Sequence, residues 1–250
     1  MTERLYYKDP RLTEFEARVL ALHPRNGRLG VVLDQTAFYP TSGGQLFDTG
    51  WIEVIGGSRE KLCVSEIAES EDSTILHWLD TAAAPAIAAG DAVRGFVDSD
   101  RRRDHMQQHS GQHVLSAAFL RVLKMPTVSF HMGDDFCTID LDAAALSPEQ
   151  ASAAEAEANR IVWSNAPVTI RFTSREEALA LGVRKLPEDV EPVRLIDMEA
   201  VDLTACGGTH VSATGEIGAI LLRKVEKSRQ GIRVEFVCGP RALRVAARDR

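Results

Sequence analysis

Four residues of this chain have the types and the spacing of metal ligands. His109 and His113 stand four residues apart in the stretch 104–115, where a helix is expected, and residues four apart lie on one face of a helix. Cys206 and His210 repeat that spacing further along the chain. One thiolate and three imidazoles form the sulfur and nitrogen donor set that a tetrahedral zinc ion prefers. The sequence therefore predicts a site for one zinc ion.

The pairing of the first two histidines has an alternative. His105 stands four residues before His109, so only one of the two pairs can chelate a metal. We favour His109 with His113 because Ser110 and Gly111 leave room on that turn, although spacing alone does not decide. The competing interpretation of the whole set is a buried histidine pair and an unrelated buried cysteine.

The residues between the histidines argue against a metalloprotease. Such enzymes carry His-Glu-x-x-His, whereas Ser110, Gly111 and Gln112 separate the two histidines here. Four protein ligands usually indicate a structural zinc, since a catalytic zinc keeps a position for water or substrate, so the role of the metal is left open. Gly111 inside a helix costs about 1 kcal/mol relative to alanine, which predicts that another segment approaches the helix closely there.

Composition predicts a soluble globular protein in the cytoplasm. The 250 residues are 44% hydrophobic and 26% charged, which is ordinary for a globular chain. The first nine residues carry charges where a signal peptide has its apolar core, and no apolar run approaches the roughly 18 residues of a membrane helix. Four cysteines are too few for a disulfide scaffold. We expect the three that lack a histidine at ligand spacing to be buried thiols: Cys63, Cys137 and Cys238.

Charge is unevenly distributed along the chain. The net charge of −7 argues against a general nucleic-acid coat. The stretch 215–250, however, holds nine basic and four acidic residues, and Arg101-Arg102-Arg103 forms a second basic cluster. These clusters favour a phosphate-bearing substrate held at a few points; solvated surface faces are the alternative.

Residues 1–97 are expected to form an all-β domain. A turn is predicted at 24–27, and the paired glycines of 41–45 predict an irregular loop. Short strands at regular spacing are typical of a small barrel or a sandwich. The predicted strands are 15–22, 30–34, 50–55, 61–67, 75–79 and 92–98.

Residues 98–250 are expected to form a second domain of mixed α/β structure, which makes the fold class α+β. A helix is predicted from about Asp98 through Lys124. Ser147-Pro148-Glu149-Gln150 has the pattern of a capping box and starts a helix to about Ser164. A short helix follows Ser174, and a basic one starts at Pro240. The predicted strands are 136–141, 167–172, 193–196, 219–225 and 232–237.

Motifs in a fixed order are similar to the editing domains of alanyl-tRNA synthetases. Because no class II aminoacylation core precedes them, the chain resembles a freestanding editing protein of the AlaX type. The similarity runs from about Arg11 to Ala242. The motifs are Phe38-Tyr39-Pro40-Thr41-Ser42-Gly43-Gly44-Gln45 with Asp48-Thr49-Gly50, His109–His113, Cys206–Val211, Thr214–Gly218 and Gly231–Phe236.

This resemblance implies a fold, a substrate and a ligand set. The fold is an N-terminal β-barrel followed by an editing domain of the kind shared with threonyl-tRNA synthetase. The substrate is tRNA(Ala) mischarged with serine, and sometimes with glycine, whose ester bond is hydrolysed. The resemblance places His105 outside the ligand set. The zinc ligands that it implies are His109, His113, Cys206 and His210.

The resemblance also implies that Thr41 and Gln45 line the pocket. Serine differs from alanine by one hydroxyl, and an apolar pocket rejects an added hydroxyl by only about 10²-fold. We predict that Thr41 hydrogen-bonds this hydroxyl and that Gln45 holds the ester carbonyl or the attacking water. We also expect Arg101 and Arg102 to contact the acceptor stem. The structural alternative for the first two is a turn threonine and a capping amide.

Other functions compete with ester hydrolysis. A zinc-stabilised tRNA-binding module without catalysis is compatible with a closed ligand set. Editing of another aminoacyl-tRNA is compatible with the zinc motifs, which threonyl-type editing domains share. Gly43-Gly44-Gln45 also resembles the tripeptide of peptide release factors, but it lies in a different motif. A nucleophilic triad is not expected, because Ser110 lies between two predicted ligands and has no evident base.

Overall fold

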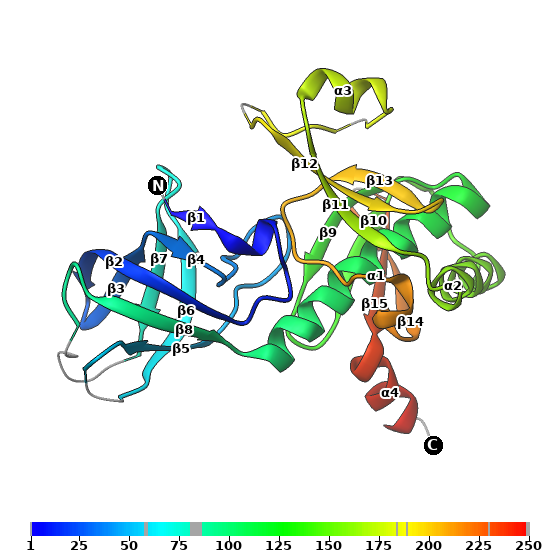
Figure 1. The fold of residues 1–250 in the computed structure, drawn as a ribbon. Coiled ribbons are helices and arrows are strands. Elements are labelled where there is room, and N and C mark those ends of the chain that lie inside the picture. Colours follow the sequence, from blue (N-terminus) through cyan, green and yellow to red (C-terminus); the bar gives the residue numbers. More distant parts are fainter. Residues whose placement is uncertain are drawn as a thin grey trace. The chain divides into compact units, whose positions relative to one another are not determined.

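The chain forms two compact units, Met1–Arg103 and Asp104–Arg250 (Figure 1). The computed structural model describes residues 2–57, 60–80, 87–183, 185–188, 190–229 and 231–248. None of the helices in these ranges combines the length and the apolar character needed to cross a membrane.

The first unit contains a closed barrel of six antiparallel strands in the order β2-β3-β7-β6-β5-β8. This confirms the predicted barrel and removes the sandwich alternative. A short parallel pair, β1 (Glu3–Arg4) with β4 (Gln35–Thr36), and the 3-10 helix η1 (Leu5–Tyr7) lie outside it. The barrel strands are β2 (Glu14–Arg25), β3 (Arg28–Leu33), β5 (Gly50–Val54), β6 (Leu62–Glu69), β7 (Ile75–Leu79) and β8 (Ala92–Val97).

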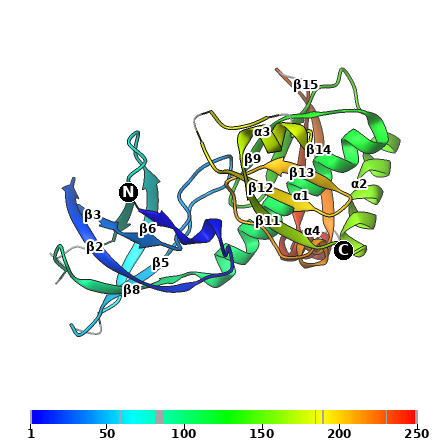
Figure 2. The same ribbon diagram turned by 45° about the horizontal axis from the view of Figure 1, so that its top comes forward.

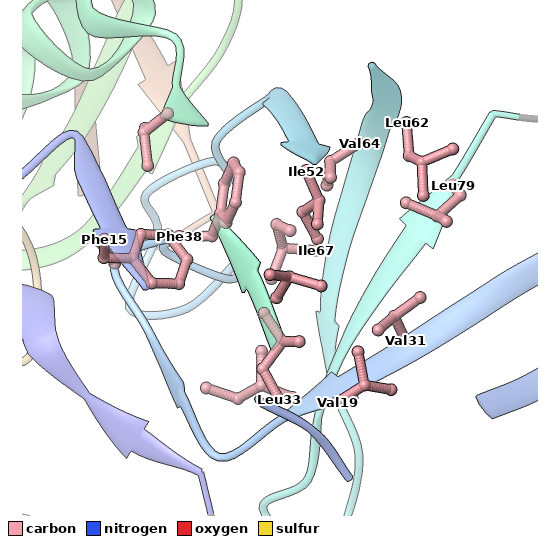
Figure 3. Close-up of a cluster of buried hydrophobic side chains, with 14 of the residues drawn as sticks. Phe15, Val19, Val31, Leu33, Phe38, Ile52, Leu62, Val64, Ile67 and Leu79 are labelled. Carbon is pink, nitrogen blue, oxygen red and sulfur yellow. The ribbon is translucent and has the colours of Figure 1, made fainter. Parts of the chain in front are cut away.

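Alternating side chains of these strands fill the barrel interior. In β6, Leu62, Val64 and Ile67 are buried in one cluster with residues of the neighbouring strands, as Figure 3 shows. The step from Val64 to Ile67 spans three residues because the pairing with β7 shifts register between Val64 and Glu66, and such a bulge changes which residues face inward. Cys63 lies between two inward residues and is exposed. The prediction that Cys63 is buried is therefore wrong.

The turn between β2 and β3 is shorter than predicted. β2 continues through Pro24 and Arg25, and Pro24 pairs with Leu29. The turn itself consists of Asn26 and Gly27, whose φ angles are 51° and 76°. Two central residues with positive φ make the tight hairpin turn that matches the twist of the flanking strands.

The second unit contains two antiparallel sheets and most of helix α1 (Ser99–Leu123), which begins in the first unit. One sheet has the order β14-β15-β10-β9, and the other has the order β11-β12-β13, visible in Figure 2. Helix α2 packs against β14 and against the 3-10 helix η2. The remaining elements are β9 (Thr127–Met132), β10 (Cys137–Leu141), α2 (Pro148–Trp163), β11 (Val168–Thr173), α3 (Arg175–Ala180), β12 (Val193–Met198), β13 (Asp202–Ala205), η2 (Thr214–Ile217), β14 (Ile220–Ser228), β15 (Gly231–Cys238) and α4 (Gly239–Arg248).

The caps predicted at the starts of helices α1 and α2 are present in the structure. The Asp98 carboxylate accepts hydrogen bonds from the backbone of Asp100 and Arg101, both at 3.1 Å, and so caps the start of α1. Lys124 has a positive φ of 58° directly after the helix end. Ser147 and Gln150 form both hydrogen bonds of the capping box at the start of α2. Two strands of the second unit, β9 and β13, were not predicted, and both are sheet edges; in the first unit the short pair β1 and β4 was not predicted either.

A buried histidine links three parts of the barrel unit. His77 on β7 is fully buried. Its Nδ1 lies 2.9 Å from the carbonyl oxygen of Val31, so Nδ1 carries the proton, and its Nε2 accepts from the Thr36 hydroxyl at 2.8 Å. The Thr36 oxygen in turn accepts from the backbone of Phe38 at 3.1 Å. Burial lowers the pKa of His77 to about 4, although the bond to Val31 opposes this shift.

Acid should weaken the barrel unit through His77. Its pKa is about 4 in the folded chain against 6.5 unperturbed, so its contribution is present above pH 6.5 and is lost as the pH falls to about 4. The loss reaches roughly 3 kcal/mol of unfolding free energy. Urea unfolding of His77→Gln, whose amide keeps both hydrogen-bond roles without titrating, should depend less on pH across this range than unfolding of the parent. Equal slopes for the two chains would contradict the prediction.

Candidate metal centre

Helix α1 presents two imidazoles on one face. The rings of His109 and His113 are stacked, with centroids 5.3 Å apart and planes 15° apart. His109 is 3% exposed and His113 is 9% exposed. His105, one turn earlier, is buried but does not belong to the donor cluster found among the described residues. The helix therefore pairs His109 with His113, as we favoured.

The other two donors follow strand β13. Cys206 comes directly after the strand, and its sulfur accepts a hydrogen bond from the backbone of Gly208 at 3.3 Å. Arg194 on β12 is 5% exposed and donates to the carbonyl oxygens of Cys206 and Gly208. The backbone of Cys206 also donates to the carbonyl oxygen of Arg194 at 3.2 Å. Arg194 thus holds the loop that carries Cys206, a role that the sequence pattern did not reveal.

The four predicted ligands converge on one point. One donor atom from each of His109, His113, Cys206 and His210 lies within 4.8 Å of the other three. The Cys206 sulfur is 3.4 Å from Nε2 of His109 and 3.3 Å from Nε2 of His210. A tetrahedral ion with bonds of about 2.0–2.3 Å separates its ligand atoms by roughly 3.3–3.8 Å. The cluster is therefore close to the size that such an ion requires.

An unsatisfied ring nitrogen supports this fit. Nε2 of His113 is buried and forms no hydrogen bond within the described part of the chain, and a buried polar atom without a partner is unfavourable. The other nitrogen of this ring, Nδ1, lies 3.3 Å from the Asp202 carboxylate. Since a carboxylate accepts, Nδ1 donates and Nε2 keeps its lone pair for a metal, as in metal sites supported by a carboxylate–histidine pair. The residues present therefore fit a metal ion.

A hydroxyl orients the third imidazole. Ser110 Oγ lies 3.1 Å from Nδ1 of His210 and accepts from the backbone of Val211 at 3.1 Å. Both bonds link helix α1 to the loop that carries His210, and they leave Nε2 of His210 facing the sulfur of Cys206. Ser110 lies between two ligands because its hydroxyl supports a third one. Spacing within the helix carried no signal of this long-range bond.

The electrostatics of the cluster favour a thiolate. Burial alone raises the pKa of the Cys206 thiol, but the imidazoles of His109 and His210 outweigh burial and hold this pKa well below its usual value. Burial lowers the pKa of His113, yet the Asp202 carboxylate and the Cys206 thiolate raise it to about 9. Burial lowers the pKa of His210 to about 3. A proton on His113 therefore balances the thiolate, and metal binding must displace that proton.

An open cavity of about 620 Å³ adjoins the cluster. His113 and Asp202 belong to its lining, and the rest comes from α1, β9, β13 and neighbouring loops. Both β9 and β13 are edge strands of their sheets, and an edge strand presents unpaired backbone donors and acceptors. Hydroxyl groups of Ser116, Thr127 and Ser129 add polar contacts to the same cavity.

The predicted pocket residues lie in one loop of the first unit. Ser42 and Gln45 exchange two backbone hydrogen bonds of 3.1 and 2.9 Å, and Gly43 and Gly44 between them have φ angles of 56° and 83°. The glycines therefore form a tight turn, where an irregular loop was predicted. Gln45 is fully buried, whereas Thr41 is exposed and its hydroxyl has no hydrogen-bond partner within the described residues.

The two predicted tRNA-binding arginines differ in exposure. Arg102 is 1% exposed and pairs with Asp48 inside the first unit. Arg101 is half-buried and donates to the carbonyl oxygen of Phe47 at 3.0 Å, with its guanidinium 5.5 Å from the Phe47 ring centroid.

Part of the basic C-terminal stretch is neutralised by ion pairs within the second unit. Residues 249 and 250 at its end lie outside the described ranges. The basic residues that pair with carboxylates are Arg223, Lys224, Arg233 and Arg241.

Two families and several relatives match the chain. Residues 10–101 match the class II (A) tRNA synthetases. Residues 193–235 match the second additional domain of threonyl and alanyl tRNA synthetases. This second range includes Cys206 and His210, whereas His109 and His113 lie outside both ranges.

Relatives of different lengths align with nearly the whole chain. The alanyl-tRNA editing protein AlaX-M of Methanosarcina acetivorans is 35% identical over 94% of this chain and 98% of its own length. AlaX-L of Pyrococcus horikoshii is 36% identical over 97% of this chain and 59% of its own length. The alanine–tRNA ligase of Pyrococcus abyssi is 36% identical over the full chain, which spans 27% of that ligase.

The close approach of Cys238 explains why position 111 of helix α1, between the two clustered histidines, is a glycine. A Cβ atom at this position would lie 2.2 Å from the sulfur of Cys238, closer than any real contact. Gly111→Ala should therefore destabilise the second unit by about 1–3 kcal/mol from overpacking, less the roughly 1 kcal/mol that alanine gains in a helix. Urea unfolding with parallel measurement of bound metal tests this expectation.

A second substitution separates the contact from a general effect on the helix. Cys238→Ala removes the sulfur that Gly111→Ala would meet, so the double variant should be more stable than the sum of the two single changes predicts. Purely additive free energies of unfolding would contradict the proposed steric cause.

Proposed function

We propose, since the chain belongs to the family of alanyl-tRNA editing proteins, that it hydrolyses the ester bond of tRNA(Ala) mischarged with serine or glycine. The observation that carries the proposal is the cluster of one thiol and three imidazoles, of which His113 lines an open cavity. The names of the relatives give alanyl-tRNA editing as their activity, and the serine or glycine ester is the finer part of the proposal. A carboxylic ester hydrolase acting on an aminoacyl-tRNA is the corresponding enzyme class.

The proposed metal is zinc, held by His109, His113, Cys206 and His210. A mixed sulfur and nitrogen donor set suits zinc, whereas calcium and magnesium prefer oxygen donors. When bound, the ion supplies a positive charge that polarises a carbonyl or anchors the substrate. Asp202 and Ser110 orient two of the imidazoles, and rigid orientation of the ligands preserves the geometry of the site.

The loop of the first unit is proposed to select the amino acid. Thr41 is exposed, and its hydroxyl has no hydrogen-bond partner among the described residues, so it can donate a hydrogen bond to the hydroxyl of serine or accept one from it. Alanine lacks that group, and binding alanine would leave a polar group of the site unpaired. Gln45 is proposed to hold the ester carbonyl or the attacking water. The acceptor-stem contact proposed for Arg101 remains compatible with its partial exposure.

Deacylation should require the metal cluster. Purified chain should hydrolyse Ser-tRNA(Ala) and spare Ala-tRNA(Ala), and removal of the metal by a chelator should abolish this activity. His109→Ala and Cys206→Ala should lower kcat/KM by at least about 10²-fold, the scale of a lost electrostatic contribution at a reacting carbonyl. His131→Ala and Cys63→Ala replace exposed residues of the same types and should leave the rate unchanged.

Two other results would contradict the hydrolytic proposal in different ways. If folded Cys206→Ala deacylated at the parental rate, the cluster would not take part in the reaction. If the parent bound tRNA(Ala) without deacylating any aminoacyl ester, the chain would be a tRNA-binding module in which four protein ligands close a structural site. Gly-tRNA(Ala), tested beside the serine ester, decides which substrate is preferred.

Thr41→Val should reduce the choice of serine over alanine. Valine keeps the shape of threonine and removes the hydroxyl, so kcat/KM for Ser-tRNA(Ala) should fall by about 10–100-fold while that for Ala-tRNA(Ala) stays equal or rises. The matched control is Ser42→Ala, which removes the neighbouring exposed hydroxyl. An unchanged ratio in Thr41→Val would move recognition of serine to other residues.

A further inference from the structure

One guanidinium group holds both ends of the loop that carries Thr41 and Gln45. Arg102 Nη2 donates to the carbonyl oxygen of Ala37, at the start of the loop, at 2.6 Å. At the end of the loop, its Nε and Nη2 donate to the Asp48 carboxylate. Its third nitrogen, Nη1, donates to the carbonyl oxygen of Pro10 at 2.6 Å.

Asp48 extends this anchor to a further loop residue. The Asp48 carboxylate accepts from the backbone of Tyr39 at 2.7 Å, and the backbone of Asp48 donates to the carbonyl oxygen of Tyr39 at 3.0 Å. The ion-paired side chains of Arg102 and Asp48 are 2% and 0% exposed. A buried ion pair is stable only when its geometry is good and its other donors and acceptors are satisfied, and here backbone groups of the loop and of Pro10 satisfy them.

The loop leaves little freedom between this anchor and the turn. Tyr39 and Asp48 are fixed to each other, and Ser42 is bonded to Gln45. Only Pro40 and Thr41 lie between Tyr39 and Ser42, so a displacement of Tyr39 reaches Thr41 within two residues. The carbonyl oxygen of Phe47 also accepts from Arg101, which restrains the returning half of the loop.

We infer that Arg102 is a positioning residue, which with Asp48 sets where the Thr41–Gln45 turn presents its side chains. An acceptor-stem contact through Arg102 would require its guanidinium at the surface, but all three of its nitrogens donate to groups inside the first unit and the residue is 1% exposed. The consequence for selectivity rests on the proposed function, in which Thr41 reads the serine hydroxyl.

Arg102→Lys tests the inference because it keeps the charge and loses the planar fork. A lysine ammonium is a point charge and cannot bind Asp48, Ala37 and Pro10 with the same geometry. The matched control is Arg28→Lys, which makes the same change in an ion pair with Glu66 on the barrel, where both side chains are about 40% exposed.

The first readout does not depend on catalysis. Hydrogen exchange of the backbone amides over residues 38–48 should become about tenfold faster or more in Arg102→Lys, while the segments that carry the metal ligands exchange as in the parent. The control Arg28→Lys should exchange as the parent does over 38–48. Unchanged protection of this loop in Arg102→Lys would overturn the inference, whatever the chain hydrolyses.

The second readout measures selectivity. The ratio of kcat/KM for Ser-tRNA(Ala) to that for Ala-tRNA(Ala) should fall by about tenfold or more in Arg102→Lys and stay constant in Arg28→Lys. The affinity for uncharged tRNA(Ala) and its dependence on salt should not change, because no phosphate contact is lost. A weaker salt dependence with constant selectivity would instead assign Arg102 to the acceptor stem and overturn the inference.

A milder variant covers the case in which Arg102→Lys does not fold. Asp48→Asn keeps one acceptor oxygen for the Tyr39 amide, but it removes the negative charge and replaces an oxygen that accepts from Arg102 with an NH2 group, and it should show the same two changes. Faster loop exchange in a chain without hydrolytic activity would support the anchor and contradict the proposed function. Loss of thermal stability with parental loop exchange and selectivity would reduce the pair to a general structural role and overturn the inference.

Discussion

The second unit depends on one electrostatic constraint, the convergence of three imidazoles and a thiol within 4.8 Å. Because Nδ1 of His113 donates to Asp202, its Nε2 is an acceptor that faces other acceptors. Acceptors that face one another repel unless a proton or a cation lies between them. The raised pKa of His113 and the lowered pKa of Cys206 follow from this repulsion, because a proton on His113 offsets the thiolate.

This constraint explains several residues that are not ligands. Arg194 and Ser110 form hydrogen bonds with the loop after β13, and Asp202 orients His113 from the start of that strand. Gly111 lets Cys238 on β15 approach α1 closely enough to pack beside the ligand-bearing turn. The geometry of the donor cluster is therefore a property of four segments together, and each support acts through a hydrogen bond or a close contact.

Buried polar groups of the first unit are likewise satisfied by partners from distant segments. The loop from Ala37 to Asp48 has little regular structure, so its backbone polar groups need partners other than a sheet ladder. Arg102, Asp48 and the His77–Thr36 pair supply them. The barrel around them is a conventional alternation of inward apolar residues, which gives these buried polar groups a rigid frame.

Much of the fold followed from local signals. Alternation of apolar residues located all six barrel strands, and the capping box located the start of α2. The edge strands β9 and β13 escaped, because most of their residues are only partly buried and a strand exposed in this way has a weak alternating pattern. Cys63 was assigned to the interior because a cysteine is usually buried, yet its position between Leu62 and Val64 places it outside.

By itself, the sequence determined two donor pairs at four-residue spacing, because such spacing is a local property, but spacing left the partner of His109 open between His105 and His113. Tertiary structure decided what spacing could not. It excluded His105 from the cluster, it left Nε2 of His113 without a hydrogen-bond partner in the described part of the chain, and it buried Arg102, which was expected at the surface. Each of these depends on partners far away in the chain, and the pairing of distant segments leaves no periodic pattern in the sequence around either one.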